Sequence, residues 1–376
     1  MASGSPSITS GGAREVTDAN RLGELRAAID AVDDELLVLL NRRAGLTIEV
    51  GEAKRQAGDD VSFYRPEREA QILRRLLSAN DGPMPDEALA RLVREIISAC
   101  LSLEKRLAIA YLGPPGTFTH AAALKHFGGS ARPVPLGTIV DVFRQVENRG
   151  CDYGVVPLEN SVGGSVNITL DCLRESTLKI VGEVLLSVHH QLLSKAPDLP
   201  AIKKVYAHDQ ALEQCRDWLQ QHLPAVERIA LASNAAAAQK AAGEPTAAAI
   251  ASVEAAELYS LPSLAANIED NPHNTTRFAV LGRELPGPSG DDRTSVMFTT
   301  VNEAGALNRL LTILAERGIS MTRIESRPLK TGGWDYLFFV DVQGHVDDDT
   351  VAAALAEIHR LAGVFKVLGS CPRALL

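Results

Sequence analysis

The sequence has little that would indicate a disulfide-linked, metal-binding or membrane-spanning protein. Only five of its 376 residues are cysteines, an odd number, and no two of them form a Cys-x-x-Cys pair. We therefore expect neither a disulfide framework nor a structural zinc site, and the thiols fit a reducing, cytoplasmic setting. No apolar run is long enough to span a bilayer.

An excess of positive charge and nucleotide-binding fingerprints are also missing. Lys and Arg number 38 against 47 Asp and Glu, so the net charge is -9. This balance argues against a nucleic-acid or anionic-membrane partner. The chain contains neither Gly-x-Gly-x-x-Gly nor Gly-Lys-Ser/Thr, and its histidines lack metal-ligand spacing. We expect no cofactor and no metal.

What remains is an ordinary globular composition, 45% hydrophobic, in a chain too long for a single core. A Ser/Gly-rich, disordered leader is expected over residues 1–17. The expected domains are an all-α three-helix domain over 18–105, an α/β domain over 106–284, a linker over 285–293 and an α+β domain over 294–376. In the α/β domain, lobe one is expected to comprise 106–185 and 267–284, and lobe two 186–266.

The front end reads as three helices with unusual charges on their apolar seams. Apolar residues from Leu25 to Leu39 alternate in steps of four and three, and the same rhythm reaches Arg43. A buried ion-pair network or a pocket for a dianion would explain such charges, and the excess of cations favours the pocket. Arg26 and Arg43 are seventeen residues apart, about 25 Å along a helix. If both serve one ligand, a second chain must supply one of them, which predicts an intertwined homodimer.

This front end resembles the all-helical chorismate mutases. The similarity covers residues 18–106 and rests on Leu25-Arg26, Arg43, the run 50–54, Arg68-Glu69 and Glu104. It implies that two arginines and a lysine bind the two carboxylates of chorismate, one arginine coming from the partner chain. It also implies that one Glu contacts the substrate hydroxyl and another donates to the ether oxygen. The residues that would bind the carboxylates are Arg26, Arg43 and Lys54, the one that would contact the hydroxyl is Glu69, and the one that would donate to the ether oxygen is Glu104. Arg68 precedes Glu69, and Cys100 would line the pocket. Arg65 replaces an Asp of some members.

The middle of the chain alternates strands, loops and helices. A strand over 107–112, a Gly-rich loop over 113–119 and a helix over 121–127 make an anion site at a helix N-terminus. The alternation continues to about Gly282 and predicts open, largely parallel sheets in two lobes around a ligand.

A polar stretch, residues 274–278, lies at the end of this region. A Thr hydroxyl, an Arg fork and a Phe ring stand side by side at Thr276, Arg277 and Phe278. These groups suit a small carboxylic acid with a ring, although a capped turn before a strand would use similar residues.

Residues 106–283 resemble the prephenate dehydratases, on the loop at 113–118, the run 156–161, His208 with Gln210, and the stretch 274–278. The family implies a two-lobed fold of the type II periplasmic-binding-protein kind and a catalytic Thr, here Thr276. We expect Thr276 to donate to the departing hydroxyl and Arg277 to anchor a carboxylate, both facing the cleft. The other expected substrate contacts are Glu159, Asn160, Ser161 and Phe278. Glu159 would be a proton source or a structural cap, and Phe278 would pack against the substrate ring or belong to the core. His189, His190 and His208 fit structural roles better than catalysis.

The tail has the order βαββαβ of a ferredoxin-like fold. It resembles the ACT regulatory domains, in which two motifs bind phenylalanine at a domain interface; a purely structural dimer module is the alternative. The matching residues are Gly305, Ala306 and Leu307, then Glu325, Ser326, Arg327 and Pro328.

Taken together, the chain resembles the bifunctional chorismate mutase–prephenate dehydratases of phenylalanine biosynthesis, which convert chorismate through prephenate to phenylpyruvate with feedback by phenylalanine. Two alternatives stay open. One is a dehydratase that prefers arogenate and carries a vestigial mutase domain. The other is an amino-acid-binding sensor without catalysis.

Overall fold

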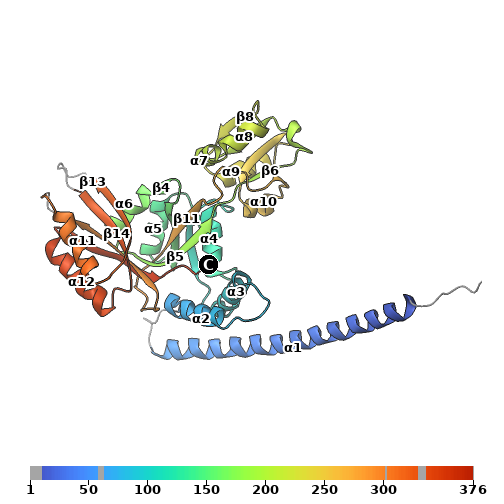
Figure 1. Ribbon diagram of the computed structural model, residues 1–376, viewed down its shortest axis with the longest axis horizontal. Helices are drawn as coiled ribbons and strands as arrows, with labels where there is room; N and C mark the ends of the chain where they lie inside the picture. Colours follow the sequence, from blue (N-terminus) through green and yellow to red (C-terminus); the bar gives the residue numbers. More distant parts are fainter. Residues whose placement is uncertain (1–10, 58–62, 301–302, 329–335, 376) are drawn as a thin grey trace, which may run out of the picture. The chain divides into compact units, whose positions relative to one another are not determined.

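The computed structural model describes residues 11–57, 63–300, 303–328 and 336–375 (Figure 1). The chain divides into two compact units, residues 1–63 and 64–376. The sequence also predicts that the first helix ends at 58–60 and that a turn falls at 332–333. These positions, like most of the expected leader, lie outside the described residues. Among the described helices, none is both long and apolar enough to cross a membrane.

The first unit is built on one helix, α1 (Gly11–Ala57), of 47 residues. It begins seven residues ahead of the expected start at Asp18, inside what the sequence suggested was a disordered leader. Its apolar seam is open: Leu25, Val32 and Leu39 are each more than half exposed. A helix of this length with an uncovered apolar seam is typical of one that pairs with another helix.

The second unit opens with α2 (Pro66–Ser78) and α3 (Asp86–Glu104), as the sequence predicts. Pro66 occupies the first helical position, where its missing N–H is not needed. Leu73 of α2 and Ala90 of α3 are buried.

The larger of two sheets runs in the order β13-β14-β12-β15-β5-β11-β3-β1-β2, with β4 paired to β3. Strand β1 is parallel to β2 and β3, but β11 is antiparallel to both β3 and β5. The sheet, expected to be largely parallel, is therefore mixed, because β5 leaves the first lobe and β11 returns beside it. The bounds are β1 (Ala108–Leu112), β2 (Arg132–Leu136), β3 (Tyr153–Asn160), β4 (Gly164–Ser165), β5 (Lys179–Ser187) and β11 (Thr275–Gly282).

Helices cover both faces of this sheet. Helices α5 (Ile139–Glu147) and α6 (Asn167–Glu175) share a core with Ala279 and Leu281 of β11. Helix α4 (Phe118–Phe127) packs on the other face, with Phe278 and Val280. Alternate residues of β11 thus enter opposite cores, as the period of a strand requires.

The second lobe has its own sheet, in the order β10-β6-β9-β7-β8. Its central strand, β9 (Ala247–Ala251), is fully buried and almost entirely alanine. The other strands are β6 (Gln191–Ser194), β7 (Lys204–Ala207), β8 (Glu227–Ala230) and β10 (Ser263–Ala265). The helical segments are η1 (Leu199–Ala201), α7 (Asp209–Gln214), α8 (Arg216–His222), α9 (Asn234–Ala241) and α10 (Val253–Tyr259).

The tail has the βαββαβ order that the sequence predicts, and α11 and α12 share one core with the strands. Its sheet joins that of the first lobe where β15 approaches β5 at Gly369. A Cβ at Gly369 would lie 2.2 Å from the Ile180 carbonyl oxygen, so only glycine fits. The elements are β12 (Asp292–Thr299), α11 (Ala306–Glu316), β13 (Met321–Pro328), β14 (Tyr336–Gln343), α12 (Asp349–Leu361) and β15 (Phe365–Pro372).

The expected linker before this domain is fastened to the structure. Arg74 of α2 donates to the carbonyl oxygens of Ser289 and Asp291, at 2.8 and 2.7 Å. Ser289 and Asp292 are buried. The tail and the two-lobed domain consequently belong to one compact unit.

Candidate active site

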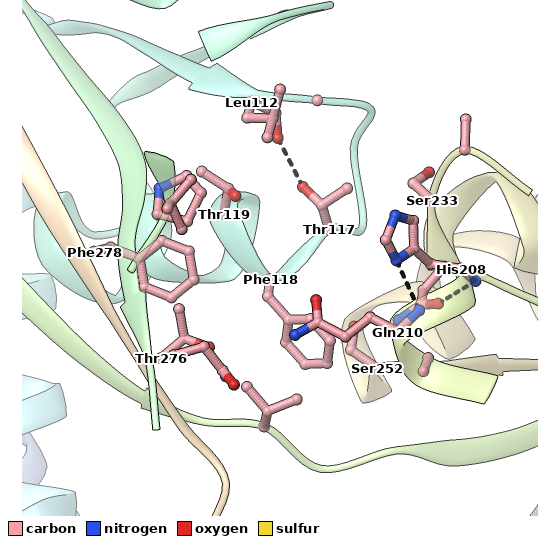
Figure 2. A pocket seen from close by; sticks show the side chains of 18 of the residues that line it. Leu112, Thr117, Phe118, Thr119, His208, Gln210, Ser233, Ser252, Thr276 and Phe278 are labelled. Atoms are coloured by element: carbon pink, nitrogen blue, oxygen red, sulfur yellow. Dashed lines mark hydrogen bonds between the residues drawn. The ribbon is translucent and has the colours of Figure 1, made fainter. Parts of the chain in front are cut away.

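A cleft of about 1030 Å³ lies between the two lobes. Figure 2 shows Thr276 and Phe278 of β11 on one side and His208, Gln210 and Ser252 of the second lobe on the other. Its lining is apolar with scattered hydroxyl and amide groups, and none of the described lining residues is Lys, Arg, Asp or Glu. This composition suits a ligand with an apolar ring and a few polar substituents.

Strand alternation decides which residues of the stretch 274–278 reach the cleft. Thr276 and Phe278 line it, and Arg277 between them points to the opposite face of the sheet. There its guanidinium lies 2.6 Å from Asp341 of the tail domain. The expectation that Arg277 faces the cleft and anchors a carboxylate there is therefore wrong.

The Thr276 hydroxyl is oriented by Asn160. The Asn160 side-chain oxygen accepts from the backbone N–H groups of Val162 and Gly163, at 3.0 and 2.8 Å. Its amide nitrogen must then face Thr276, and it donates to Thr276 Oγ1 at 2.9 Å and to Asn274 Oδ1 at 2.7 Å. Because that nitrogen can only donate, the Thr276 hydroxyl proton remains available to a ligand.

The two neighbours of Asn160 do not line the cleft. Glu159 lies opposite Arg277 in the β3–β11 pairing and forms ion pairs with Arg277 and Arg323, at 3.3 and 3.2 Å. Its proposed role as a proton source in the cleft is thus corrected to a structural one. The Ser161 hydroxyl accepts from the Thr275 N–H at 2.9 Å and fixes the strand end.

Helix N-termini from both lobes surround the cleft. Thr117 caps α4 through the His120 N–H, and Ser233 caps α9 through the Ala236 N–H. His208 and Ser252 cap α7 and α10 in the same way. Such ends carry partial positive charge, so an anionic ligand can be accommodated although the described lining has no Lys or Arg.

Part of this lining was not predicted from the sequence. The loop at 113–119 was expected, but Gln210, Ser233 and Ser252 were not assigned to the site. Ser233 and Ser252 each precede an alanine-rich segment, which is an N-cap signal in the sequence. Their distance along the chain from Thr276 concealed that they share one cleft.

The three singled-out histidines have different surroundings. His189 Nδ1 lies 2.7 Å from Glu269. His190 is buried and contacts Gln214, and burial lowers its pKa, so it stays neutral. His208 lines the cleft as a helix cap. Among the described residues, no group of His, Cys, Asp and Glu is arranged to hold a metal ion.

The residues expected for the mutase reaction are divided between the two units. On α1, Arg26 is exposed and Arg43 and Lys54 are half-buried. Lys54 Nζ donates to the Phe63 carbonyl at 3.2 Å and lies 5.6 Å from the Phe63 ring centre.

On α2 and α3, the expected mutase residues differ in burial. Arg65 is exposed and pairs with Glu67 at 2.7 Å, and Arg68 is exposed as well. Burial raises the pKa of Glu69 to about 7, and the nearby Arg94 opposes this rise. Cys100 is buried, and Glu104 is the half-buried last residue of α3.

The expected effector residues lie at the start of α11 and on β13 of the tail domain. Gly305 has φ 79°, a left-handed conformation that glycine favours, and immediately precedes α11 with Ala306 and Leu307. On β13, Glu325 and Arg327 are half-buried against the first lobe, where they contact Ser165 and Asp171. Their neighbours Ser326 and Pro328 are exposed.

Three family models match the chain in sequence. They are Chorismate mutase type II over residues 25–105, Prephenate dehydratase over 109–286 and ACT domain over 294–360. Fold and cleft thus define a multidomain enzyme with a helical mutase-type front end, a two-lobed dehydratase domain and an ACT domain.

Relatives of known function share this whole arrangement. A "Bifunctional chorismate mutase/prephenate dehydratase" of Neisseria gonorrhoeae is 50% identical, covering 93% of this chain and 97% of the relative. The chain belongs to the family of bifunctional chorismate mutase/prephenate dehydratases.

Solved structures resemble a large part of the chain. A prephenate dehydratase from Arthrobacter aurescens, in complex with L-Phe, superposes with a TM-score of 0.65 at 36% identity, covering 71% of this chain and 90% of that one. A protein described as a quorum quenching acylase, GqqA, also superposes with a TM-score of 0.65, at 31% identity, covering 71% and 98%.

Proposed function

We propose that the protein converts chorismate to prephenate and prephenate to phenylpyruvate, and that phenylalanine inhibits the second step. The observation that carries the dehydratase proposal is the Asn160–Thr276 contact in the cleft. Family membership supports both activities and their order along the chain.

The dehydratase step needs one proton. Prephenate, a dianion, takes up one H⁺, and two of its bonds break. The bond between the ring and its carboxylate breaks and releases CO₂, and the bond between the ring and its hydroxyl breaks and releases water. The electron pair of the first bond completes the aromatic ring, and phenylpyruvate remains. Thr276, whose hydroxyl proton is left unused by Asn160, donates a hydrogen bond to the departing hydroxyl.

Neutral groups bind the rest of this substrate. Phe278 and Phe118 line the cleft and supply flat apolar surface for the ring. The remaining carboxylate is held by the N-termini of α4 and α9 and by the Ser233 hydroxyl, since Arg277 is committed elsewhere and the Thr117 hydroxyl donates to the Leu112 carbonyl.

The mutase step is a rearrangement within one molecule and needs no nucleophile. We propose that Arg26, Arg43 and Lys54 bind the two carboxylates, while Glu69 and Glu104 contact the hydroxyl and ether oxygens. Holding a compact conformer and placing cations where charge develops then accelerates the reaction.

A homodimer completes this proposal. The exposed apolar seam of α1 supports it, because a second α1 would cover side chains that water now surrounds. The spacing of Arg26 and Arg43, about 25 Å on one helix, requires that a partner chain supply one of them. The five free cysteines fit a cytoplasmic setting.

Feedback by phenylalanine is proposed from the ACT match and from the L-Phe complex of the Arthrobacter aurescens dehydratase. The motif residues at the start of α11 and on β13 are the proposed contacts. Added phenylalanine should lower the dehydratase rate, and an unchanged rate at saturating phenylalanine would contradict this part of the proposal.

Product analysis tests the function directly. Purified protein is incubated with chorismate, and prephenate and phenylpyruvate are quantified over time. We expect both to appear in that order, and Arg43→Ala to abolish conversion of chorismate while leaving conversion of added prephenate intact. Turnover of arogenate but not prephenate would favour the arogenate alternative, and binding without turnover would favour a sensor.

A further inference from the structure

Behind the cleft, on the opposite face of β11 from Thr276, lies a cluster of charged side chains, all of them largely buried except Glu159. Arg277 is 8% exposed and its guanidinium approaches three carboxylates: Asp341 at 2.6 Å, Glu159 at 3.3 Å and Glu183 at 3.5 Å. Two of these carboxylates belong to the dehydratase strands β3 and β5, and Asp341 belongs to β14 of the ACT domain.

The ACT domain supplies two arginines in return. Arg323 of β13 pairs with Glu159 at 3.2 Å, and Arg293 of β12 pairs with Glu183. Three guanidinium groups therefore meet three carboxylates, so charge is balanced across the domain boundary. The members of this charged cluster are Glu159, Glu183, Arg277, Arg293, Arg323 and Asp341.

Asp341 stays ionised although it is buried. Burial alone would raise the pKa of Asp341, but Arg277, a hydrogen bond from Ser295 and Arg323 together lower it below its usual value. Removing one partner of such a pair leaves an uncompensated charge in the interior, which is strongly unfavourable.

Two cluster members are chain neighbours of the cleft residues that carry the reaction. Arg277 follows Thr276, and Glu159 precedes Asn160. Because successive side chains of a strand face opposite ways, a shift of either charged residue displaces its neighbour in the cleft.

A second contact leads from the same ACT strand to the cleft lining. Arg323 donates to the Ser165 hydroxyl at 2.6 Å, and that hydroxyl donates to Glu325 at 3.0 Å. Ser165 lines the cleft, and Glu325 opens the expected effector motif on β13. Movement of β13 would therefore alter both Arg323–Glu159 and Glu325–Ser165.

We propose that the charged cluster is the physical link through which the ACT domain controls the position of Thr276, with Arg277 a positioning residue and not a substrate ligand. An effector can bind more tightly when β13 is displaced than when β13 has the position seen in this structure. Binding of such an effector would loosen the Arg323–Glu159 pair and shift the Asn160–Thr276 pair. This inference rests on the proposed dehydratase function.

A double-mutant cycle tests the link in the full-length chain. The variants are Asp341→Asn, Arg277→Gln and both together, with Arg317→Gln as matched control. Arg317 donates to the Ile313 carbonyl and pairs with Glu357, and both partners lie inside the ACT domain. Dehydratase kcat and KM for prephenate, the phenylalanine concentration for half inhibition, mutase rate and Tm are measured for each.

We expect Asp341→Asn to lower kcat for prephenate about tenfold with KM within twofold of wild type, and to raise the half-inhibiting phenylalanine concentration at least fivefold. The double variant should be no slower than Arg277→Gln, and Arg317→Gln should behave as wild type. The mutase rate should stay unchanged throughout.

Two results would overturn the inference. One is an Asp341→Asn enzyme whose kcat and inhibition both stay within twofold of wild type. The other is a parallel fall of mutase rate, dehydratase rate and Tm, since this would assign the cluster to stability alone. Failure of the proposed function is seen separately, as wild-type protein that does not turn over prephenate.

Discussion

Replacing Asn160 by aspartate reverses the polarity of the contact that orients Thr276. The introduced carboxylate keeps one oxygen for the N–H groups of Val162 and Gly163, but its other oxygen now faces the Thr276 hydroxyl. A carboxylate can only accept, so Thr276 must donate its proton to the side chain at position 160 and not to the substrate. Asn274 can adapt, because its Nδ2 has no hydrogen-bond partner among the described residues and its amide can turn round.

The size of the effect follows from that hydrogen bond. A hydrogen bond to a charged group contributes about 1.5–3 kcal/mol, and this energy must be given up before the hydroxyl can serve the leaving group. At 1.36 kcal/mol per factor of ten, dehydratase kcat should fall about 10- to 150-fold.

The assay is phenylpyruvate formation from prephenate, with prephenate formation from chorismate measured on the same preparation. Asn148→Asp is the control, because it makes the same change of charge at an exposed position after α5. A dehydratase kcat within twofold of wild type in Asn160→Asp would refute the assigned direction of the Asn160–Thr276 hydrogen bond.

Three other changes have defined outcomes. The folded-state pKa of Glu69, about 7, exceeds its ordinary 4.5, so the folded protein retains a proton that the unfolded chain loses. The stability contributed by this group therefore falls as pH rises from 4.5 through 7, by at most about 3 kcal/mol. Urea unfolding at pH 5 and 8 should show this loss of unfolding free energy in wild type and not in Glu69→Gln, and an equal loss in both proteins would contradict it. Leu36→Asp on the exposed seam of α1 should shift the protein from dimer to monomer in sedimentation and reduce the mutase rate, whereas an unchanged assembly would remove support for pairing through α1. Gly369→Ala should lower Tm and weaken phenylalanine inhibition, because the added Cβ meets the Ile180 carbonyl. Gly287→Ala, where a Cβ meets nothing closer than 3.9 Å, should do neither. An unaffected Gly369→Ala protein would show that β15 and β5 can separate freely.

The order of elements could be predicted because each one carries its own period. Steps of four and three from Leu25 to Leu39 mark a helix, and the βαββαβ order of the tail follows from alternating patterns and turn residues. Periodicity carries no strand direction, however, so the antiparallel return of β11 beside β5 could not be predicted from it.

Thr276 lines the cleft, as expected, and the next residue, Arg277, does not. Adjacent residues of a strand face opposite sides, so Thr276 and Arg277 could not both reach the cleft once 275–282 forms a strand. The partners of Arg277 come from β3, β5 and β14, more than sixty residues away in the case of Asp341. No local sequence pattern predicts such a cluster, because its members are far apart along the chain. The cleft-lining hydroxyls of Ser233 and Ser252 were not predicted for the same reason.

The central claim, that the Thr276 hydroxyl serves dehydration and nothing else in the protein, is tested by comparing Thr276→Ser with Thr276→Val. Serine keeps the hydroxyl, and valine keeps the shape without it. With prephenate as substrate, the serine variant should retain kcat within about tenfold and the valine variant should lose at least about a hundredfold, while both convert chorismate to prephenate at the wild-type rate. Equal dehydratase rates in the two variants, or equal loss of mutase and dehydratase activity, would contradict the account.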